Sequence, residues 1–349
     1  MLKRHWFPGI RSVTKVLILS LMATQVQADD YLVYASNEDS NELSIINPDN
    51  NESIGTIAVG KRPRGVRVSP DGAKIYVALS GSPKCPPSMP DSECEKLIAD
   101  KTADGIAVID ATTRKVERVL PGGSDPEQFD ISPDQSRLFI ANEDQGTATI
   151  VDIASGQVVK ELRVGREPEG VKAAPDGNVF LVTGESDHDV SIVDARSGEL
   201  LGSVKVGLRP RDIIFTPDGR QAIVSAEASH QVDIIDMATR AVVRTIKLQE
   251  GVLPMGLALA PDGQILYVAN GRAKTVSKID YQSGAVLASA EVGPRPWGIA
   301  LSPDGKRLYT ANGPSNDVTV IDTETFTVSE RIPVGKSPWG VAIGKKLPQ

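Results

Sequence analysis

The chain has 349 residues and a formal net charge of −7, with 40% hydrophobic and 24% charged residues. This balance is typical of a globular protein, and the acidic charge argues against nucleic-acid binding, which needs a basic surface. Aromatic residues make up only 4% of the chain, so we expect a core of Val, Ile, Leu and Ala.

The N-terminal segment differs from the rest of the chain. Four Lys and Arg residues precede the apolar run Val16–Ala23, and Val26-Gln27-Ala28 places apolar or small residues before a cleavage site. This pattern predicts a signal peptide over residues 1–28 and export to the periplasm. A membrane anchor is disfavoured because the apolar run is too short to span a bilayer, so we expect no span in the mature chain. Cleavage removes four positive charges and no acids, which takes the net charge from −7 to −11.

A repeat of about 42 residues fills the remainder of the chain. The last unit shows four extended segments: Trp297–Leu301, Arg307–Asn312, Val318–Asp322 and Thr327–Val334. A turn of the type Ser-Pro-Asp-Gly follows the first segment, and its Asp recurs at Asp71, Asp134, Asp176, Asp218, Asp262 and Asp304. Four strands per unit at this period are typical of a β-propeller.

The two ends of the chain complement each other. The N-terminus begins with strands two to four of a unit, and the C-terminus ends with a lone first strand, Trp339–Ile343. Pairing these ends in one blade gives an all-β, seven-bladed propeller with four antiparallel strands per blade, formed by residues 29–349 as one domain. We number as blade 1 the blade that the two ends share.

Blade 2 contains an insertion over residues 81–103. It carries the only cysteines of the chain, Cys85 and Cys94, in a Pro-rich loop. In an exported protein such a pair predicts a local disulfide.

The first strand of each blade is expected to lie nearest the axis. One apolar position recurs there, and Gly precedes it in five of the seven blades. Small residues suit blades that crowd together at the axis. The position after the apolar residue is charged in blades 2 to 4 (Arg67, Asp130 and Lys172) and apolar in the others.

Because strands alternate in direction, the loops between strands two and three and the loops between blades share one face, here called the top face. The insertion lies on this face. Propellers usually bind their ligands there.

The inter-blade loops of the top face differ around a shared Pro. Blades 2 to 5 form a charged arc: Arg62 and Arg64, Asp125 and Glu127, Glu167 and Glu169, Arg209 and Arg211. Blades 6, 7 and 1 form an apolar arc at one equivalent position: Met255, Trp297 and Trp339. Arg295 precedes the Pro of blade 7. We predict that these residues bind a ligand or partner; the alternatives are structural ion pairs and Trp residues that merely cap the closure.

The other top-face loops add acidic and imidazole groups. Glu38, Glu143, Glu185 and Glu227 share one position, and so do His188 and His230. A cation would relieve the repulsion among the glutamates, yet exposed carboxylates repel weakly and loop histidines are usually solvated. We therefore include these residues in the candidate binding surface and assign no metal ligands.

Several chemistries lack their residues. The mature chain has two His, and the sequence contains no G-x-S-x-G, P-loop, G-x-G-x-x-G or C-x-x-C-H motif. It thus shows no sign of serine-hydrolase, nucleotide, dinucleotide or covalent haem chemistry. We assign no catalytic residue and no bound cofactor.

The aligned repeats resemble the YVTN-type propeller repeat over residues 31–344. Blade-specific pieces, among them Lys61-Arg62-Pro63-Arg64-Gly65, Ala141-Asn142-Glu143-Asp144 and Pro338-Trp339-Gly340-Val341, resemble the PQQ-dependent catabolism-associated β-propeller proteins. The resemblance implies an exported protein whose genes accompany quinoprotein alcohol dehydrogenases, their cytochromes and a transport operon. That family has no catalytic motif to transfer, and the cysteine-containing insertion departs from its pattern.

Two functional hypotheses follow. The first is a monomeric periplasmic binding or accessory protein for PQQ-dependent alcohol oxidation, which contacts a dehydrogenase, cytochrome or transport component, or a small ligand, through its top face. The second is an enzyme of propeller type, either a metal-assisted lactone hydrolase or a quinone-dependent oxidoreductase.

Overall fold

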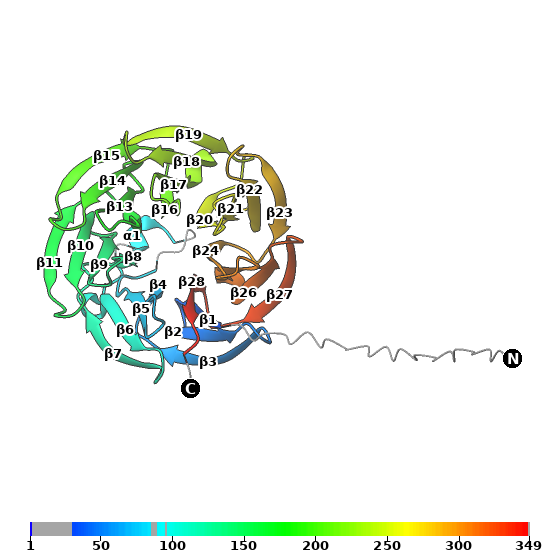
Figure 1. Cartoon of the computed structure of the whole chain (residues 1–349). Helices are drawn as coiled ribbons and strands as arrows, with labels where there is room; N and C mark the ends of the chain where they lie inside the picture. Colours follow the sequence, from blue (N-terminus) through cyan, green and yellow to red (C-terminus); the bar gives the residue numbers. More distant parts are fainter. Residues whose placement is uncertain (2–29, 85–88, 95, 348–349) are drawn as a thin grey trace.

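The computed structural model describes residue 1 and residues 30–84, 89–94 and 96–347. In this part of the chain, seven four-stranded antiparallel sheets surround a central axis as blades (Figure 1). The structure confirms the predicted seven-bladed β-propeller, and the predicted strand ends agree with the observed ones to within two residues.

The strands run from the axis to the rim in each blade. Blades 1 and 2 consist of β28 (Pro338–Lys345), β1 (Tyr31–Asn37), β2 (Glu42–Asn47) and β3 (Glu52–Ala58), then β4 (Pro63–Val68), β5 (Lys74–Leu79), β6 (Gly105–Asp110) and β7 (Lys115–Leu120). Blades 3 and 4 consist of β8 (Pro126–Ile131), β9 (Arg137–Asn142), β10 (Thr147–Asp152) and β11 (Val158–Arg163), then β12 (Pro168–Ala173), β13 (Val179–Gly184), β14 (Asp189–Asp194) and β15 (Leu200–Lys205). Blades 5 to 7 consist of β16 (Pro210–Phe215), β17 (Gln221–Ala226), β18 (Gln231–Asp236) and β19 (Ala241–Lys247), β20 (Pro254–Leu259), β21 (Ile265–Asn270), β22 (Thr275–Asp280) and β23 (Val286–Glu291), and β24 (Pro296–Leu301), β25 (Arg307–Asn312), β26 (Asp317–Asp322) and β27 (Thr327–Pro333).

Blade 1 closes the ring as the sequence predicts. Its axial strand β28 comes from the C-terminus and pairs antiparallel with β1 from the N-terminal side, from Tyr31 opposite Lys345 to Asn37 opposite Pro338. This pairing removes two strand edges that would otherwise be open to association with other chains.

The apolar core lies between neighbouring blades. One cluster joins Tyr34, Leu43 and Ile45 of blade 1 to Ile75 and Val77 of blade 2, and similar clusters follow around the ring. The apolar position predicted nearest the axis is buried in six blades and partly buried in blade 7, at Val66, Phe129, Val171, Ile213, Leu257, Ile299 and Val341. Each blade thus buries its faces against the next one.

The face opposite the top face is built from repeated turns. In blade 7, Gly305 has φ 73° and donates its N–H to the carbonyl of Ser302 at 2.8 Å, as predicted for the Pro-Asp-Gly turn. Asp322, at the end of the third strand, accepts the Thr325 N–H at 2.8 Å, and equivalent aspartates do the same in other blades. These conserved positions of the repeat hold the turns and form the scaffold.

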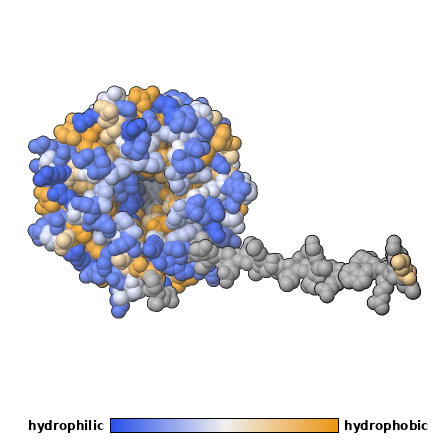
Figure 2. All heavy atoms as spheres, in the orientation of Figure 1, coloured by the Kyte–Doolittle hydropathy of each residue, from blue (hydrophilic) through white to orange (hydrophobic). Residues whose placement is uncertain are grey.

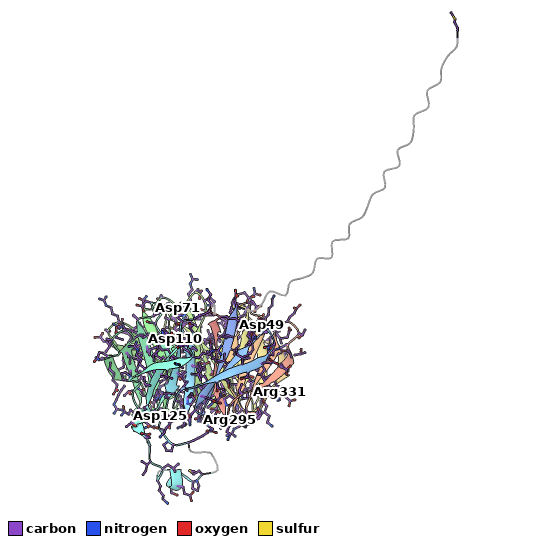
Figure 3. All side chains as sticks on the ribbon, turned by 90° about the horizontal axis from the view of Figure 1, so that it is seen from below. Asp49, Asp71, Asp110, Asp125, Arg295 and Arg331 are labelled. Carbon is purple, nitrogen blue, oxygen red and sulfur yellow. The ribbon has the colours of Figure 1, made fainter. Side chains whose placement is uncertain are left out.

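The top face carries the insertion and the remaining short elements. In the described part these are α1 (Asp91–Cys94) and three 3₁₀ turns, η1 (Lys101–Ala103), η2 (Glu227–Ser229) and η3 (Gly313–Ser315). In the side view, Asp125 and Arg295 lie towards the face that carries the insertion, whereas Asp71 lies towards the opposite face (Figure 3).

Some predictions fall outside the described residues. Cys85 is one of these residues, so the Cys85–Cys94 disulfide remains a prediction, and so does the signal peptide over residues 1–28. No helix within the described ranges is long and apolar enough to cross a membrane.

Candidate functional site at the mouth of the central channel

Every axial strand carries a β-bulge at its top end. In β4, Pro63 pairs with Leu79 and Val66 with Val77, so two residues, Arg64 and Gly65, face one residue of β5. The same two-to-one count recurs in the other six axial strands. A bulge re-aims the side chains at its position. The first bulge residue comes from the same place in each blade, and this set is Arg64, Glu127, Glu169, Arg211, Met255, Trp297 and Trp339.

The second bulge residue explains the glycines of the axial strands. A Cβ added at Gly256 or Gly298 would lie 2.5 or 2.8 Å from the carbonyl oxygen of the next blade's first bulge residue, Trp297 or Trp339. Blades 3 and 5 carry Gln128 and Asp212 at this position, and both side chains line the channel.

The residue before each shared Pro is held in an unusual conformation. Arg62, Asp125, Arg209 and Arg295 all have positive φ, between 41° and 56°. Non-glycine residues adopt this left-handed region at a cost of about 1–2 kcal/mol, and such strain is concentrated at functional sites. The loops therefore hold the charged side chains of the rim in fixed directions.

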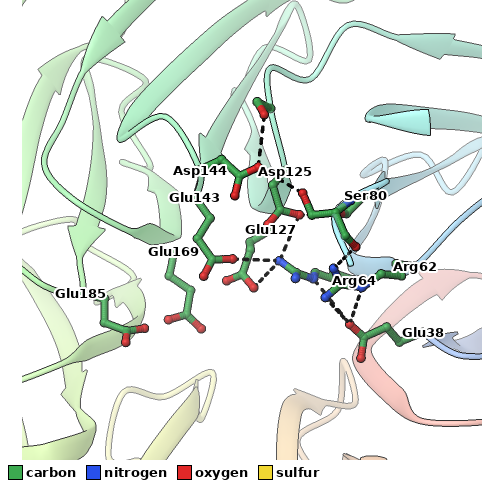
Figure 4. A network of polar contacts seen from close by, with 12 residues as sticks. Glu38, Arg62, Arg64, Ser80, Asp125, Glu127, Glu143, Asp144, Glu169 and Glu185 are labelled. Carbon is green, nitrogen blue, oxygen red and sulfur yellow. Dashed lines mark hydrogen bonds and ion pairs between the residues drawn. The ribbon is translucent and has the colours of Figure 1, made fainter. Parts of the chain in front are cut away.

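Arg64 lies at the centre of the first ion cluster (Figure 4). Its guanidinium hydrogen-bonds Glu127 and contacts Glu143 at 3.2 Å and Asp125 at 3.6 Å. On the other side Glu38 accepts a hydrogen bond from Arg62 at 2.8 Å and pairs with Lys84 of the insertion at 2.9 Å. Arg64 is 5% exposed, so one buried cation holds carboxylates from three blades together.

Arg211 forms a second cluster on blades 4 and 5. It pairs closely with Glu169 and Glu185, and its Nε donates to Glu227 at 2.6 Å. Arg209 supports the cluster from the surface through a hydrogen bond to Glu185 at 2.7 Å. The structural ion pairs considered as the alternative for the charged arc are thus present.

The carboxylates between the two clusters repel each other. Repulsion from Glu127 together with burial raises the pKa of Glu143 to about 9, although Arg64 opposes the shift. Burial raises the pKa of Glu127 and of Glu169, against the attraction of Arg64 and Arg211 respectively. Glu38 differs, because Arg64 and Arg62 outweigh the effect of burial and hold its pKa below the usual value. Raised carboxyl pKa values of this kind are common at functional sites.

The apolar arc closes the other half of the mouth. The rings of Trp297 and Trp339 meet edge to face, with centroids 5.6 Å apart. Arg211 and Arg295 lie over the Trp297 ring at 5.4 and 5.2 Å, so this ring joins the two arcs. Met255 and Trp339 are almost fully buried, whereas Arg295 is exposed.

Below the rim the channel contains a cavity of about 200 Å³. The space-filling view shows the ring hollowed at this place (Figure 2). Arg67 and Lys172, on blades 2 and 4, line the cavity, and both pair with Asp130 on blade 3, at 3.5 and 3.1 Å. The charged residues that follow the axial apolar position thus form a second, deeper layer of charge.

The two histidines occupy turns rather than the channel. His188 and His230 have φ of 55° and 51° at the corner before the third strand, a position that Asn41 and Asn316 fill in other blades with similar φ. Their Nδ1 atoms contact the carbonyl oxygens of Glu185 and Val252 at 2.8 and 2.9 Å. Within the described ranges, no three His, Cys, Asp or Glu side chains converge as a metal-ligand group.

The structure brings most of the predicted residues together, and it adds several. Gln128 and Asp212 were missed, although the absence of the expected Gly in blades 3 and 5 marks both positions in the sequence. Lys84 was missed because no repeat predicts where an insertion folds back.

The fold and the site define a seven-bladed propeller with a charged and an apolar arc at one channel mouth. The chain belongs to the YNCE-like beta-propeller family, whose profile matches residues 89–178 and 179–349. No curated protein sequence matches the chain.

Solved structures share the fold at low sequence identity. The periplasmic gluconolactonase PpgL of Pseudomonas aeruginosa is 19% identical (TM-score 0.71; 91% of this chain and 99% of that chain covered). A putative 6-phosphogluconolactonase of Bacteroides fragilis is 18% identical (TM-score 0.72; 90% and 98%). Kuenenia stuttgartiensis hydrazine synthase is 22% identical (TM-score 0.69; 80% and 89%).

Proposed function

We propose that the protein is an exported binding or accessory protein for PQQ-dependent alcohol oxidation, and that its top-face rim binds a protein of that system. The observation that carries the proposal is the contrast between the two faces. The opposite face repeats the same turn from blade to blade, whereas the equivalent top-face positions run from Arg and Glu to Met and Trp. A scaffold does not require that diversity, but a specific interface does.

The composition of the rim suits a protein partner. Arg209 keeps 47% of its side chain exposed and Glu143 keeps 36%, and Arg295 and Leu208 are exposed beside them. Arg and Trp are enriched among the residues that dominate binding energy in protein interfaces, and a mixed-charge rim favours one orientation of the partner.

Two further points support the setting. The blade-specific motifs resemble the PQQ-dependent catabolism-associated propellers, which links the chain to quinoprotein alcohol dehydrogenases, their cytochromes and a transport component. The basic and apolar N-terminal pattern supports export.

The test is the affinity of the full chain for the purified PQQ-dependent alcohol dehydrogenase and cytochrome of the same organism. We expect Arg295→Glu to weaken binding at least tenfold, because it reverses an exposed rim charge without touching the buried clusters. Arg220→Glu is the matched control, since Arg220 is 85% exposed on a turn of the opposite face. Equal affinities for the two variants, or no binding by the wild type, would sink the proposal.

A second candidate is a lactone hydrolase. It is favoured by one observation, a Glu143 carboxyl with a pKa of about 9 beside the Arg64 guanidinium, an arrangement suited to proton transfer next to a positive charge. The lactonase names of two structural neighbours point the same way. Gluconolactone hydrolysis followed in a pH-stat separates the candidates: turnover lost in Glu143→Gln supports the enzyme, and a rate equal to the buffer rate removes it.

A further inference from the structure

The cavity beneath the rim has two chemically different walls. Its polar wall comes from blades 2 to 4 and includes Arg67, Gln128 and Lys172. Its apolar wall comes from blades 5 to 7 and blade 1 and includes Ile214, Met255, Trp297 and Trp339. A ligand that fits such a space has one polar end and one apolar end.

The charge of the polar wall gives the sign of the polar end. Arg67 and Lys172 share the single carboxylate of Asp130, which stands behind them and is 6% exposed. Asp130 also accepts the Ala173 N–H at 3.0 Å, so its oxygens are already occupied. The two cations that face the cavity therefore have more donors than Asp130 satisfies.

The acidic residues of the cavity are already engaged. Asp212 accepts the backbone N–H groups of Ile213 and Leu257 at 2.9 and 2.8 Å, one on each oxygen. Burial raises its pKa, which weakens its negative charge. Glu169 pairs closely with Arg211. A cationic ligand would have to displace these contacts, whereas an anion meets donors that are not fully used.

The apolar wall is pre-formed and leaves room for a hydrocarbon chain. Met255 is 4% and Trp339 is 7% exposed, and the Trp297 and Trp339 rings brace each other at 5.6 Å. The glycines at 256, 298 and 340 line the same wall without side chains.

We propose that the channel cavity binds a small organic carboxylate, with its carboxylate on Arg67 and Lys172 and its apolar tail against Met255, Trp297 and Trp339. This proposal goes beyond the proposed function, since it concerns the channel below the rim and stands whether or not a protein docks above it.

Tryptophan fluorescence reads this site directly. The chain has three Trp residues, so Trp6→Phe leaves Trp297 and Trp339 as the only emitters. Full-length protein with this change is titrated with hexanoate, hexanol and hexylamine, which share one tail and differ in the head group. We expect saturable emission changes with hexanoate at concentrations at least tenfold below those for hexanol and hexylamine. Tighter binding of hexylamine, or no saturation with hexanoate, overturns the proposal.

Two variants place the head group. Changing Arg67→Gln, Asp130→Asn and Lys172→Gln together removes both cations without leaving Asp130 charged and unpaired, and we expect at least tenfold weaker hexanoate binding with hexanol unchanged. Lys205→Met, on the outer strand of blade 4 and 74% exposed, is the control and should bind as the parent does. A triple variant that binds hexanoate like the control contradicts the assignment.

A gain of affinity avoids any question of folding. Ile214 lines the cavity at the position that holds Arg67 and Lys172 in other blades, so this place in a blade accepts long cationic side chains. We expect Ile214→Lys to tighten hexanoate binding severalfold and Ile214→Glu to weaken it, and the reverse order refutes the proposal. Dehydrogenase binding measured on the same variants should not change, which separates a failure here from a failure of the rim interface.

Discussion

The charged arc and the apolar arc use the same backbone for opposite chemistry. Both are built on a bulge at the top of an axial strand and on a loop with a shared Pro, yet one buries Arg64 among carboxylates and the other buries Met255 and Trp339. Buried ion clusters are a poor route to stability, because desolvation of the charges offsets most of their attraction. The comparison teaches that the charged arc is poorly explained by folding alone, which directs attention to binding.

The largest effect is expected from breaking the charged arc. Arg64→Met leaves Glu127, Asp125 and Glu38 buried without their shared cation, so we expect a loss of about 3–5 kcal/mol in the free energy of unfolding. Urea denaturation measures it. Arg295→Met, which removes an exposed arginine over the apolar arc, should change stability by less than about 0.5 kcal/mol. Similar losses for the two variants would mean that the arcs do not differ energetically.

A smaller effect tests the backbone that the two arcs share. Gly256→Ala places a Cβ 2.5 Å from the Trp297 carbonyl oxygen, where only a shift of the backbone relieves the clash, so we expect a loss of about 1–3 kcal/mol. Gly313→Ala is the control, because its Cβ would meet its nearest atom at an ordinary 3.6 Å. Thermal unfolding compares the two, and an unchanged midpoint for Gly256→Ala argues against tight packing at the axis.

The pH dependence of stability distinguishes the arcs more gently. The folded-state pKa of Glu143 is about 9 against an ordinary 4.5, so the folded protein binds more protons than the unfolded chain between these values, and its stability falls as pH rises through that window. Solvent screening of a side chain that is 36% exposed limits the effect to about 1 kcal/mol.

The matched measurement uses Glu143→Gln. This variant should be more stable than the parent at pH 9 and no more stable at pH 5, whereas Glu324→Gln, at an exposed glutamate of blade 7, should follow the parent at both values. A parent whose stability does not change between pH 5 and pH 9 contradicts the repulsion between Glu127 and Glu143.

The smallest effect concerns the insertion. The predicted Cys85–Cys94 disulfide closes a short loop outside the blades, so mild reduction should lower the thermal midpoint by no more than about 1–2 °C. Calorimetry with and without dithiothreitol checks this. A collapse of the fold on reduction would show that the insertion supports the ring.

The repeat predicts the fold well because its signals are local. The Pro-Asp-Gly turn, the aspartate after the third strand and the complementary ends determine strand number and closure from short-range chemistry, and the structure agrees. The site was predicted in part, since the loop positions around each Pro identify the rim.

Other features required the structure. The sharing of Arg64 among Glu38, Asp125, Glu127 and Glu143 depends on contacts between blades far apart in sequence, and so does the link from Lys84 to Glu38. The histidines show the opposite case: a shared position suggested a common site, whereas the left-handed corner of the turn accounts for that position.

Hydrogen–deuterium exchange of the full chain with and without the purified alcohol dehydrogenase tests the central claim most directly. We expect protection in the inter-blade loops of the mouth, around Arg209 and Arg295, and no change in the repeated turns of the opposite face around Asp71 and Asp304. Protection confined to those turns, with the mouth unchanged, would contradict the assignment of the binding surface to the top face.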